Sequence, residues 1–232
     1  MKTFAIGDIH GAYKALLQCL ERSGFDYGKD RLIVLGDIVD GWPETPQCIE
    51  ELFKIKNLVV VMGNHDTWVD DWFRTGAEPD LWTSQGGQAT LDAYRRNPEF
   101  IEQHRDFFKY APSYFKNSPY YFVDEKNRLY VHGGFRTYLP IQEQSPEVLM
   151  WDRDLAIDAM RGPVFVKEYQ EVFLGHTTTE RFSLEPVISG NVILLDQGGG
   201  WGGKLSIMDV ETHEFWQSDV VTSLYAGVRG KK

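Results

Sequence analysis

The sequence predicts an α/β fold built around a parallel sheet. Three apolar runs rich in β-branched residues lie at positions 2–6, 31–35 and 57–62, and each ends in a glycine followed by a polar residue. Stretches with apolar residues at helical spacing lie between these runs. Strands that alternate with helices in this way are typical of a parallel α/β sheet.

The two intervening helices have recognisable ends. Residues 12–22 carry an apolar stripe at spacings of three and four, and Gly24 provides a stop after it. Thr45 can cap the second helix, with Pro46 at its first position. We therefore expect strand, helix, strand, helix and strand in succession.

Residues 67 to about 118 interrupt this alternation. Helical spacing recurs at 91–96 and 100–110, so we predict a small helical insertion after the third strand. The segment is rich in aromatic residues: Trp68, Trp72, Trp82, Tyr94, Phe100, Phe107, Phe108 and Tyr110. These aromatics form the insertion's own core, because a helix must bury one face, or they form a wall or lid over a site.

Strand character returns in the second half of the chain. The predicted strands cover residues 120–123, 128–131, 171–174 and 191–195, followed by an antiparallel pair at 204–210 and 214–217. The sequence contains no internal repeat, low-complexity tract or linker. We therefore predict one domain over residues 1–232 that carries the insertion.

The net charge of −10 excludes several classes of partner. An acidic chain is poorly suited to neutralising nucleic-acid phosphates or to docking on anionic lipid, so we expect neither partner. No apolar stretch is long enough to span a bilayer. The two cysteines form no C-x-x-C pair, and the first strand follows Met1 too closely for a signal peptide. These features favour a cytoplasmic protein.

Metal-ligating side chains follow the strand ends. In open α/β sheets ligands bind beyond the carboxyl ends of the strands, so we expect these side chains to converge. Their nitrogen and oxygen atoms suit divalent Mn, Fe or Zn, and six ligands can hold two ions that share one carboxylate. The six residues are Asp8, His10, Asp37, Asn64, His132 and His176.

Each of these residues alone has a simpler explanation. An aspartate after glycine is commonly a turn residue, and a histidine after a strand is commonly a buried hydrogen-bonded side chain. Four of the six histidines nevertheless lie at the ends of apolar runs, and only His104 and His213 lie elsewhere. One site explains this pattern better than six coincidences do.

Five short blocks resemble those of the metallophosphoesterases, and most closely those of the small bacterial and phage members of the phosphoprotein phosphatase branch. The segment 82–94, the tripeptide at 151–153 and the segment 196–205 also resemble these enzymes, so the likeness covers nearly the whole chain. The blocks are Gly7-Asp8-Ile9-His10-Gly11, Gly36-Asp37-Ile38-Val39-Asp40, Gly63-Asn64-His65-Asp66, His132-Gly133-Gly134 and Gly175-His176-Thr177.

The resemblance implies a β-sandwich flanked by helices and a specific division of roles. His65 would protonate the leaving oxygen with Asp40 orienting it, while Arg153 and Asn64 would contact the phosphate. A hydroxide bridging two divalent ions, Mn with Fe or Zn as alternatives, would attack directly. Asp8 and His10 would hold one ion, Asp37 would bridge, and Asn64, His132 and His176 would hold the other.

The sequence departs from the family pattern beside the bridging aspartate. The family runs Asp-Arg-Gly where this chain has Asp40-Gly41-Trp42, so an arginine that helps to bind phosphate is missing. Trp42 either packs inside the protein or stacks on a ring of the substrate. Asp66 replaces a glutamate, and Gln197 stands where threonine is common.

Three functions follow as hypotheses. The first is a phosphatase for phosphomonoesters, with phosphoserine, phosphothreonine or phosphotyrosine in proteins as substrates. The alternative is a hydrolase of dinucleoside polyphosphates such as diadenosine tetraphosphate, which uses the same metal blocks. A non-catalytic binding module is a third reading, supported only by the missing arginine. The oligomeric state is not predictable from these features.

Overall fold

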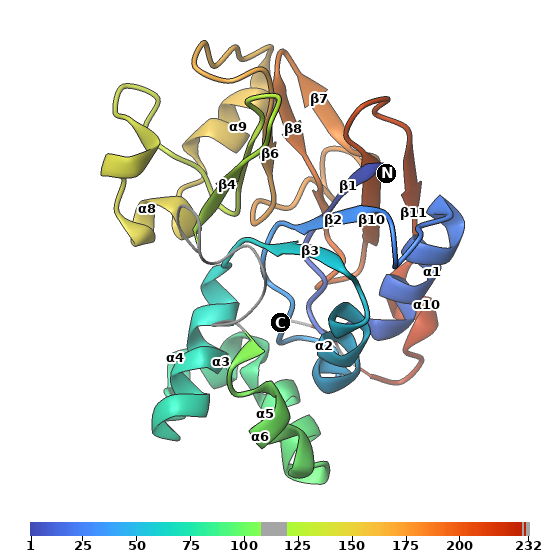
Figure 1. The fold of residues 1–232 in the computed structure, drawn as a ribbon. Coiled ribbons are helices and arrows are strands. Elements are labelled where there is room, and N and C mark those ends of the chain that lie inside the picture. The colour runs from blue at the N-terminus through green and yellow to red at the C-terminus, as the bar shows by residue number, and fades with distance from the viewer. Residues whose placement is uncertain (108–119, 229, 231–232) are drawn as a thin grey trace.

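The computed structural model of the chain describes residues 1–107, 120–228 and 230, and within them the strands form two sheets (Figure 1). The first sheet has the order β11-β10-β1-β2-β3, with β9 paired to β10. Its strands are β1 (Thr3–Ile6), β2 (Arg31–Val34), β3 (Asn57–Val60), β9 (Asp196–Gln197), β10 (Lys204–Asp209) and β11 (Phe215–Gln217).

The parallel arrangement predicted for the first three strands is confirmed. β1 pairs with β2 in parallel, with Phe4 opposite Leu32, and β2 pairs with β3 in parallel, with Leu32 opposite Leu58. β10 and β11 form the expected antiparallel pair, and β10 joins the sheet beside β1. All three parallel strands therefore end at the same edge.

The second sheet has the order β4-β5-β6-β8-β7. Its centre is again parallel, because β5, β6 and β8 run in the same direction. The edge strand β7 was not predicted, since three residues are too few to show periodicity. The strands are β4 (Tyr121–Val123), β5 (Leu129–Val131), β6 (Val172–Leu174), β7 (Val187–Ser189) and β8 (Val192–Leu194).

The two sheets stack on each other as a sandwich. Ala5, Ile33 and Val59 of the first sheet form one buried cluster with residues of the second, including Tyr130 and Phe173, whose rings stack at 4.9 Å. Helices cover the outer faces, with α1 and α2 beside the first sheet and α8 and α9 beside the second (Figure 1). This agrees with the fold implied by the resemblance. The helices are α1 (Tyr13–Ser23), α2 (Thr45–Phe53), α8 (Pro146–Trp151), α9 (Asp154–Arg161) and the C-terminal α10 (Val221–Leu224), with a 3-10 turn at Ile141–Glu143.

The two predicted helix ends had different outcomes. α1 ends as expected, with Gly24 in the left-handed conformation at φ 65°. The expectation that Thr45 caps α2 was wrong, because the N-cap is Glu44 and Thr45 lies inside the helix. The Thr45 hydroxyl instead lies 3.1 Å from the hydroxyl of Thr90, which belongs to the segment after β3.

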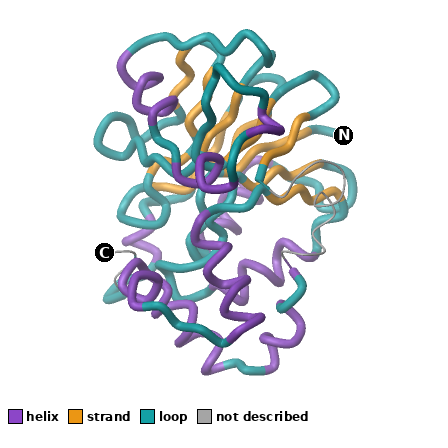
Figure 2. The backbone as a smooth tube through the Cα atoms, turned by 90° about the vertical axis from the view of Figure 1, so that its left-hand side faces the viewer, coloured by secondary structure: helices purple, strands orange, loops and turns teal. Residues whose placement is uncertain are grey.

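The segment after β3 is helical, as predicted, and its helices gather with one another below the strands (Figure 2). Its first helix begins at Asn64, within the predicted site, and not at residue 67. Trp72, Trp82 and Tyr94 pack together in a core that continues into that of the first sheet. Residues 108–118 of the predicted insertion lie outside the described residues. The elements are α3 (Asn64–Thr75), α4 (Asp80–Trp82), a kinked turn η1 (Thr83–Gly87), α5 (Gln88–Arg96) and α6 (Glu99–His104).

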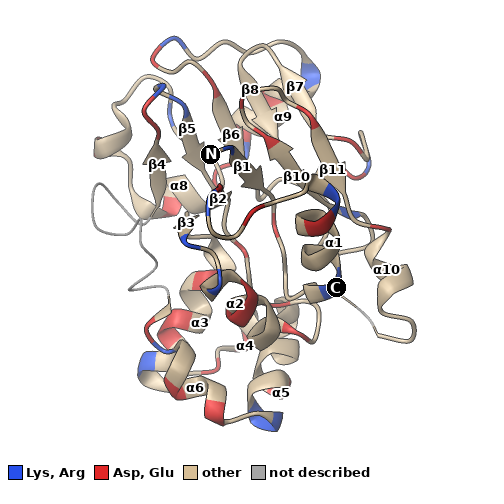
Figure 3. Ribbon diagram, turned by 45° about the vertical axis from the view of Figure 1, so that its right-hand side comes forward, with Lys and Arg blue, Asp and Glu red and all other residues tan. Residues whose placement is uncertain are grey.

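The charges are spread over the surface, and acidic residues are prominent on α2, α3 and α6 (Figure 3). Within the described ranges, every helix is too short or too polar to cross a lipid bilayer. Both cysteines, Cys19 and Cys48, are buried and unpaired with each other.

Candidate metal and phosphate site

The predicted metal ligands form two groups that share one residue. The side chains of Asp8, His10 and Asp37 offer ligand atoms within 4.8 Å of one another, and so do those of Asp37, His132 and His176. They follow β1, β2, β5 and β6, so both sheets contribute. All of these side chains are buried. Asp37 is the common member, which is the position predicted to bridge.

Asn64 joins the second group from the start of α3. Its Oδ1 atom lies 3.1 Å from Nε2 of His132. All six predicted ligands are therefore brought together by the fold. Their assignment to particular ions stays a prediction.

Two of the histidines are oriented by backbone carbonyls. Nδ1 of His132 donates to the carbonyl of Leu35 at 2.7 Å, and Nδ1 of His10 donates to that of Val39 at 3.0 Å. A carbonyl can only accept, so each Nδ1 carries a proton, and in the neutral imidazole the lone pair is on Nε2. Those Nε2 atoms lie 3.4 and 3.5 Å from the Asp37 carboxylate. Histidines that bind metal through one ring nitrogen commonly donate a hydrogen bond from the other.

The electrostatics of the group favour a cation. Burial, together with the nearby carboxylate of Asp196, raises the pKa of Asp8 well above its usual range. Burial also acts to raise the pKa of Asp37, but the charges of His132 and His65 hold it well below its usual range. For His132 burial lowers the pKa, yet the Asp37 carboxylate outweighs this and raises it to about 9. Buried carboxylates and imidazole nitrogens that face one another are a donor set that fits a pair of Mn, Fe or Zn ions.

Asp66 holds the loop that carries Asp37. Its carboxylate accepts the backbone N–H groups of Asp37 (2.8 Å), Ile38 (2.9 Å) and Gly63 (3.0 Å). Burial and the Asp37 charge raise the pKa of Asp66 to about 7. The loops are strained, since four non-glycine residues of the site have positive φ angles, a feature that clusters at functional sites. These are His10 (50°), Asp37 (49°), Asp40 (71°) and His176 (59°).

Glycines beside the ligands allow the strands to approach closely. A Cβ atom on Gly63 would lie 2.2 Å from Oδ1 of Asp37, and one on Gly175 would lie 2.4 Å from Oδ1 of Asp8. Neither contact is possible without movement. The sequence pattern of glycine beside each ligand thus has a steric cause.

The predicted acid pair is in contact. Nδ1 of His65 lies 2.7 Å from Oδ2 of Asp40, and both side chains are buried. Among the described residues, Nε2 of His65 has no hydrogen-bond partner. The imidazole lies edge-on between the rings of His10 and Trp68, each with its centroid 5.0 Å away. Sequence reasoning did not assign Trp68 a place beside this histidine.

The sequence model of the calcineurin-like phosphoesterases matches residues 1–190. The chain belongs to this family. Its fold also resembles the metallophosphoesterase of Sphaerobacter thermophilus, with a TM-score of 0.56, 18% identity, and 98% and 99% of the two chains covered.

Two kinds of curated relative match this calcineurin-like phosphoesterase. A symmetrical bis(5'-nucleosyl)-tetraphosphatase of Coxiella burnetii is 37% identical over 176 residues, which cover 74% of this chain and 53% of that protein. The serine/threonine-protein phosphatase 1 of Salmonella typhimurium is 24% identical over 90% of this chain and 91% of that protein. The tetraphosphatase of Cellvibrio japonicus is 43% identical over only 67 residues, which cover 28% of this chain and 25% of that protein.

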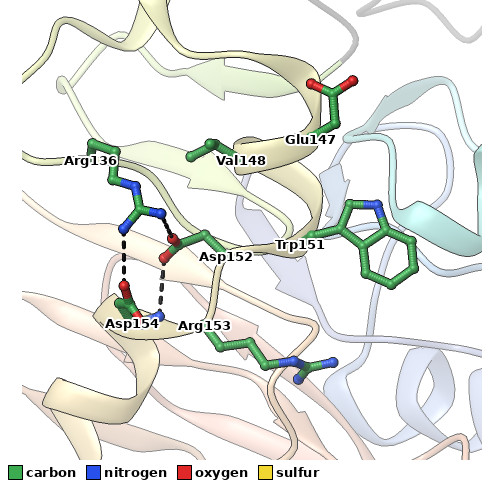
Figure 4. A pocket seen from close by; sticks show the side chains of 7 residues that line it. All are labelled: Arg136, Glu147, Val148, Trp151, Asp152, Arg153 and Asp154. Atoms are coloured by element: carbon green, nitrogen blue, oxygen red, sulfur yellow. Dashed lines mark hydrogen bonds and ion pairs between the residues drawn. The ribbon is translucent and has the colours of Figure 1, made fainter.

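Arg153 lies beside the segment that carries the predicted ligand His176. Its Nη1 atom donates to the backbone carbonyl of His176 at 2.8 Å and contacts the hydroxyl of Thr177 at 3.3 Å. It lines a hollow of about 420 Å³ together with Trp151 and Arg136. Figure 4 shows Arg136 paired with two carboxylates on one side of the hollow and Trp151 and Arg153 extending away from them.

Two tryptophans, neither predicted as site residues, border the ligands. Trp151 is 42% exposed and lies edge-on to His176, with ring centroids 5.9 Å apart. Its ring also contacts that of Trp68 at 5.7 Å. Only closeness in sequence to predicted site residues could have indicated them. Trp151 precedes Arg153 by two residues, and Trp68 lies one helical turn after His65.

The departure from the family pattern at Gly41 and Trp42 has a structural explanation. Trp42 is fully buried, donates Nε1 to the carbonyl of Gly199 at 2.8 Å and stacks on Tyr225 at 4.9 Å. It therefore packs inside the protein and does not stack on a substrate. Gly41 has φ 86°, a conformation that an arginine adopts only with strain.

Proposed function

We propose that this calcineurin-like phosphoesterase is a two-metal hydrolase of phosphoric esters or anhydrides, formed by one domain over residues 1–232. The observation that carries the proposal is the membership of Asp37 in both ligand groups. Asp8 and His10 would hold one ion, and Asn64, His132 and His176 the other. Two divalent ions, manganese with iron or zinc as alternatives, supply a nucleophile at neutral pH and offset phosphate charge when bound.

The protein's own groups would orient the substrate and move the proton. Asp40 accepts from Nδ1 of His65, so the proton for the leaving oxygen is carried on Nε2. Arg153 would bind a phosphate oxygen with the part of its guanidinium that does not contact His176. Asn64 would contact the phosphate in addition to its ion.

The first candidate substrates are dinucleoside polyphosphates. The identity to the Coxiella tetraphosphatase is 37%, whereas the identity to the Salmonella phosphatase is 24%. The hollow beside Arg153 and the exposed ring of Trp151 are suited to a nucleoside, whose base can stack on an indole. We therefore place dinucleoside polyphosphates ahead of phosphorylated proteins, which the sequence alone had favoured as substrates.

The second candidate substrates are phosphorylated proteins. The observation that favours them is length, since the match to the Salmonella phosphatase covers 91% of that protein, against 53% of the Coxiella tetraphosphatase. A protein substrate needs an open site, and the hollow beside Arg153 meets that need equally well.

A hydrolysis panel with added manganese tests the proposal. Purified protein is offered p-nitrophenyl phosphate, phosphoserine and phosphotyrosine peptides, and diadenosine tetraphosphate. We expect kcat/KM to be highest for diadenosine tetraphosphate, and a preference for the peptides would favour the second candidate. Hydrolysis of none, with no metal bound on elemental analysis, would overturn the proposal and favour a binding module.

A further inference from the structure

The carboxylate of Asp40 accepts hydrogen bonds from three side chains. Oδ2 accepts from Nδ1 of His65 at 2.7 Å and from Nε1 of Trp82 at 2.8 Å. Oδ1 accepts from the hydroxyl of Thr90 at 2.8 Å. Asp40, Trp82 and Thr90 are all fully buried. Two of the three donors thus come from the helical segment after β3, more than 40 residues along the chain.

The hydroxyl of Thr90 has each of its bonding positions assigned. It donates its only proton to Asp40, and it accepts the backbone N–H of the same aspartate at 3.0 Å. The remaining lone pair faces the hydroxyl of Thr45 at 3.1 Å, which must therefore be the donor. Thr90 therefore binds both the backbone and the carboxylate of Asp40. Thr45 of α2 in turn donates a hydrogen bond to Thr90.

The kinked turn η1 between Trp82 and Thr90 adds a backbone contact. The N–H of Gly41 donates to the carbonyl of Gly86 at 3.1 Å, and Gly86 has φ 107°. A Cβ on Gly87 would lie 2.4 Å from Nε1 of Trp82, so this turn packs directly against the indole. The turn is a kink between α4 and α5, because Gln85 and Gly86 have non-helical backbone angles.

We infer that Trp82 and Thr90 are positioning residues for the acid His65, and that the segment 82–90 builds the proton-donating half of the site. The inference rests on the proposed function. Three donors prevent rotation of the carboxylate, because each oxygen is held in place. The carboxylate oxygen that accepts from His65 then keeps a proton on Nδ1 and fixes where Nε2 points. A displaced acid transfers its proton poorly even when every metal ligand is intact.

Leaving-group dependence separates positioning from simple structural support. An acid matters most when the leaving oxygen is a strong base, as in phenyl phosphate, and little when it is p-nitrophenolate. Loss of structure would reduce hydrolysis of both compounds equally. The variants are Trp82→Phe and Thr90→Val. Thr90→Val keeps the volume but removes the hydroxyl that both donates to and accepts from Asp40. Trp82→Phe removes the indole N–H together with part of the ring. Trp72→Phe is the matched control, because Trp72 packs against Trp82 in the same core.

We expect kcat for phenyl phosphate to fall by roughly 10- to 100-fold more than kcat for p-nitrophenyl phosphate in both variants. KM should change little, Thr90→Ser should restore most of the loss, and Trp72→Phe should show no such difference. Equal losses on the two substrates, or no loss, would overturn the inference.

A second measurement does not depend on activity. The Nδ1 proton of a histidine bound to a carboxylate gives a far-downfield NMR signal, which His65→Asn identifies by its disappearance. We expect Trp82→Phe and Thr90→Val to broaden or shift this signal, and Trp72→Phe to preserve it. An unchanged signal in both variants would overturn the inference. An inactive wild-type protein with the expected NMR changes would instead overturn only the proposed function.

Discussion

The backbone N–H of His65 donates to Oδ1 of Asp37 at 2.9 Å. The proposed acid and the carboxylate shared by both ligand groups are thus joined by one hydrogen bond. His65 lies in the first turn of α3, and the N–H groups of a helix N-terminus favour a negative partner. The first turn of α3 therefore sets the spacing between the proton donor and the metal groups.

Replacing Asp37 with asparagine should remove metal and activity while the fold survives. Asparagine keeps one oxygen that can accept the His65 N–H, but it lacks the charge and the second oxygen needed to bridge. We expect bound manganese to fall below that of the wild type and kcat to fall by orders of magnitude. Elemental analysis, hydrolysis of p-nitrophenyl phosphate and circular dichroism measure the three properties. A normal kcat would contradict the bridging role.

Unlike Asp37→Asn, His65→Asn should keep its bound metal and lose only activity. The side chain of His65 contacts Asp40 and is not a member of either ligand group. We expect metal content to stay at the wild-type level and kcat for phenyl phosphate to fall by about 10²- to 10⁴-fold. Parallel loss of metal would show that the residue acts as a ligand and not as an acid.

Gly175→Ala should weaken metal binding through a steric effect. The added Cβ would lie 2.4 Å from Oδ1 of Asp8 and would displace this carboxylate. Titration of the metal-free protein with manganese should show lower affinity. Gly162→Ala is the matched control, because nothing lies within 4 Å of its Cβ. Equal affinity in the two variants would rule out this steric role.

Restoring the family's arginine by Gly41→Arg should not improve the enzyme. Gly41 has φ 86°, where a side chain costs roughly 1–2 kcal/mol. Its Cβ would also lie 3.4 Å from that of His10. We expect a lower melting temperature and no gain in kcat/KM. A clear gain for phosphomonoesters would mean that the loop adapts and that the arginine was simply lost.

Glu211→Gln should reduce stability at neutral pH and not in acid. Hydrogen bonds from Arg128 and Lys126 lower the pKa of Glu211 to about 2. The unfolded value is about 4.3, so the stabilisation is complete above that pH and disappears as the pH falls towards 2. Glu211 is partly exposed, so the effect is about 1 kcal/mol at most. The melting temperatures of the wild type and of Glu211→Gln should therefore differ less at pH 3 than at pH 7.

The strand ends were predictable because their signal is local. An apolar run followed by glycine and Asp8, or by glycine and His176, shows both the strand and the polar side chain beyond it. Parallel order then places such ends at one edge of a sheet. The contact between His132 of the second sheet and Asp37 of the first was not derivable from either sequence block alone, because it depends on how the sheets stack.

The supports around the site could not be predicted for the same reason. Trp82 reads as a core aromatic, and nothing near it in sequence indicates that its indole bonds to Asp40. Thr45 reads as a helix cap because capping is a local preference, yet its hydroxyl faces Thr90. A hydroxyl or indole N–H bonds to whichever acceptor the tertiary fold brings near, and short-range patterns do not contain that information.

The origin of the ligands in two different sheets has a thermodynamic consequence. A cation shared by Asp37 and His132 would tie the two layers together at their common edge, as a cross-link does. Binding to the folded state alone adds its free energy to that of folding, so the melting temperature should rise with free metal and drop under chelation. The ions that take part in hydrolysis would then also stabilise the packing of the two sheets.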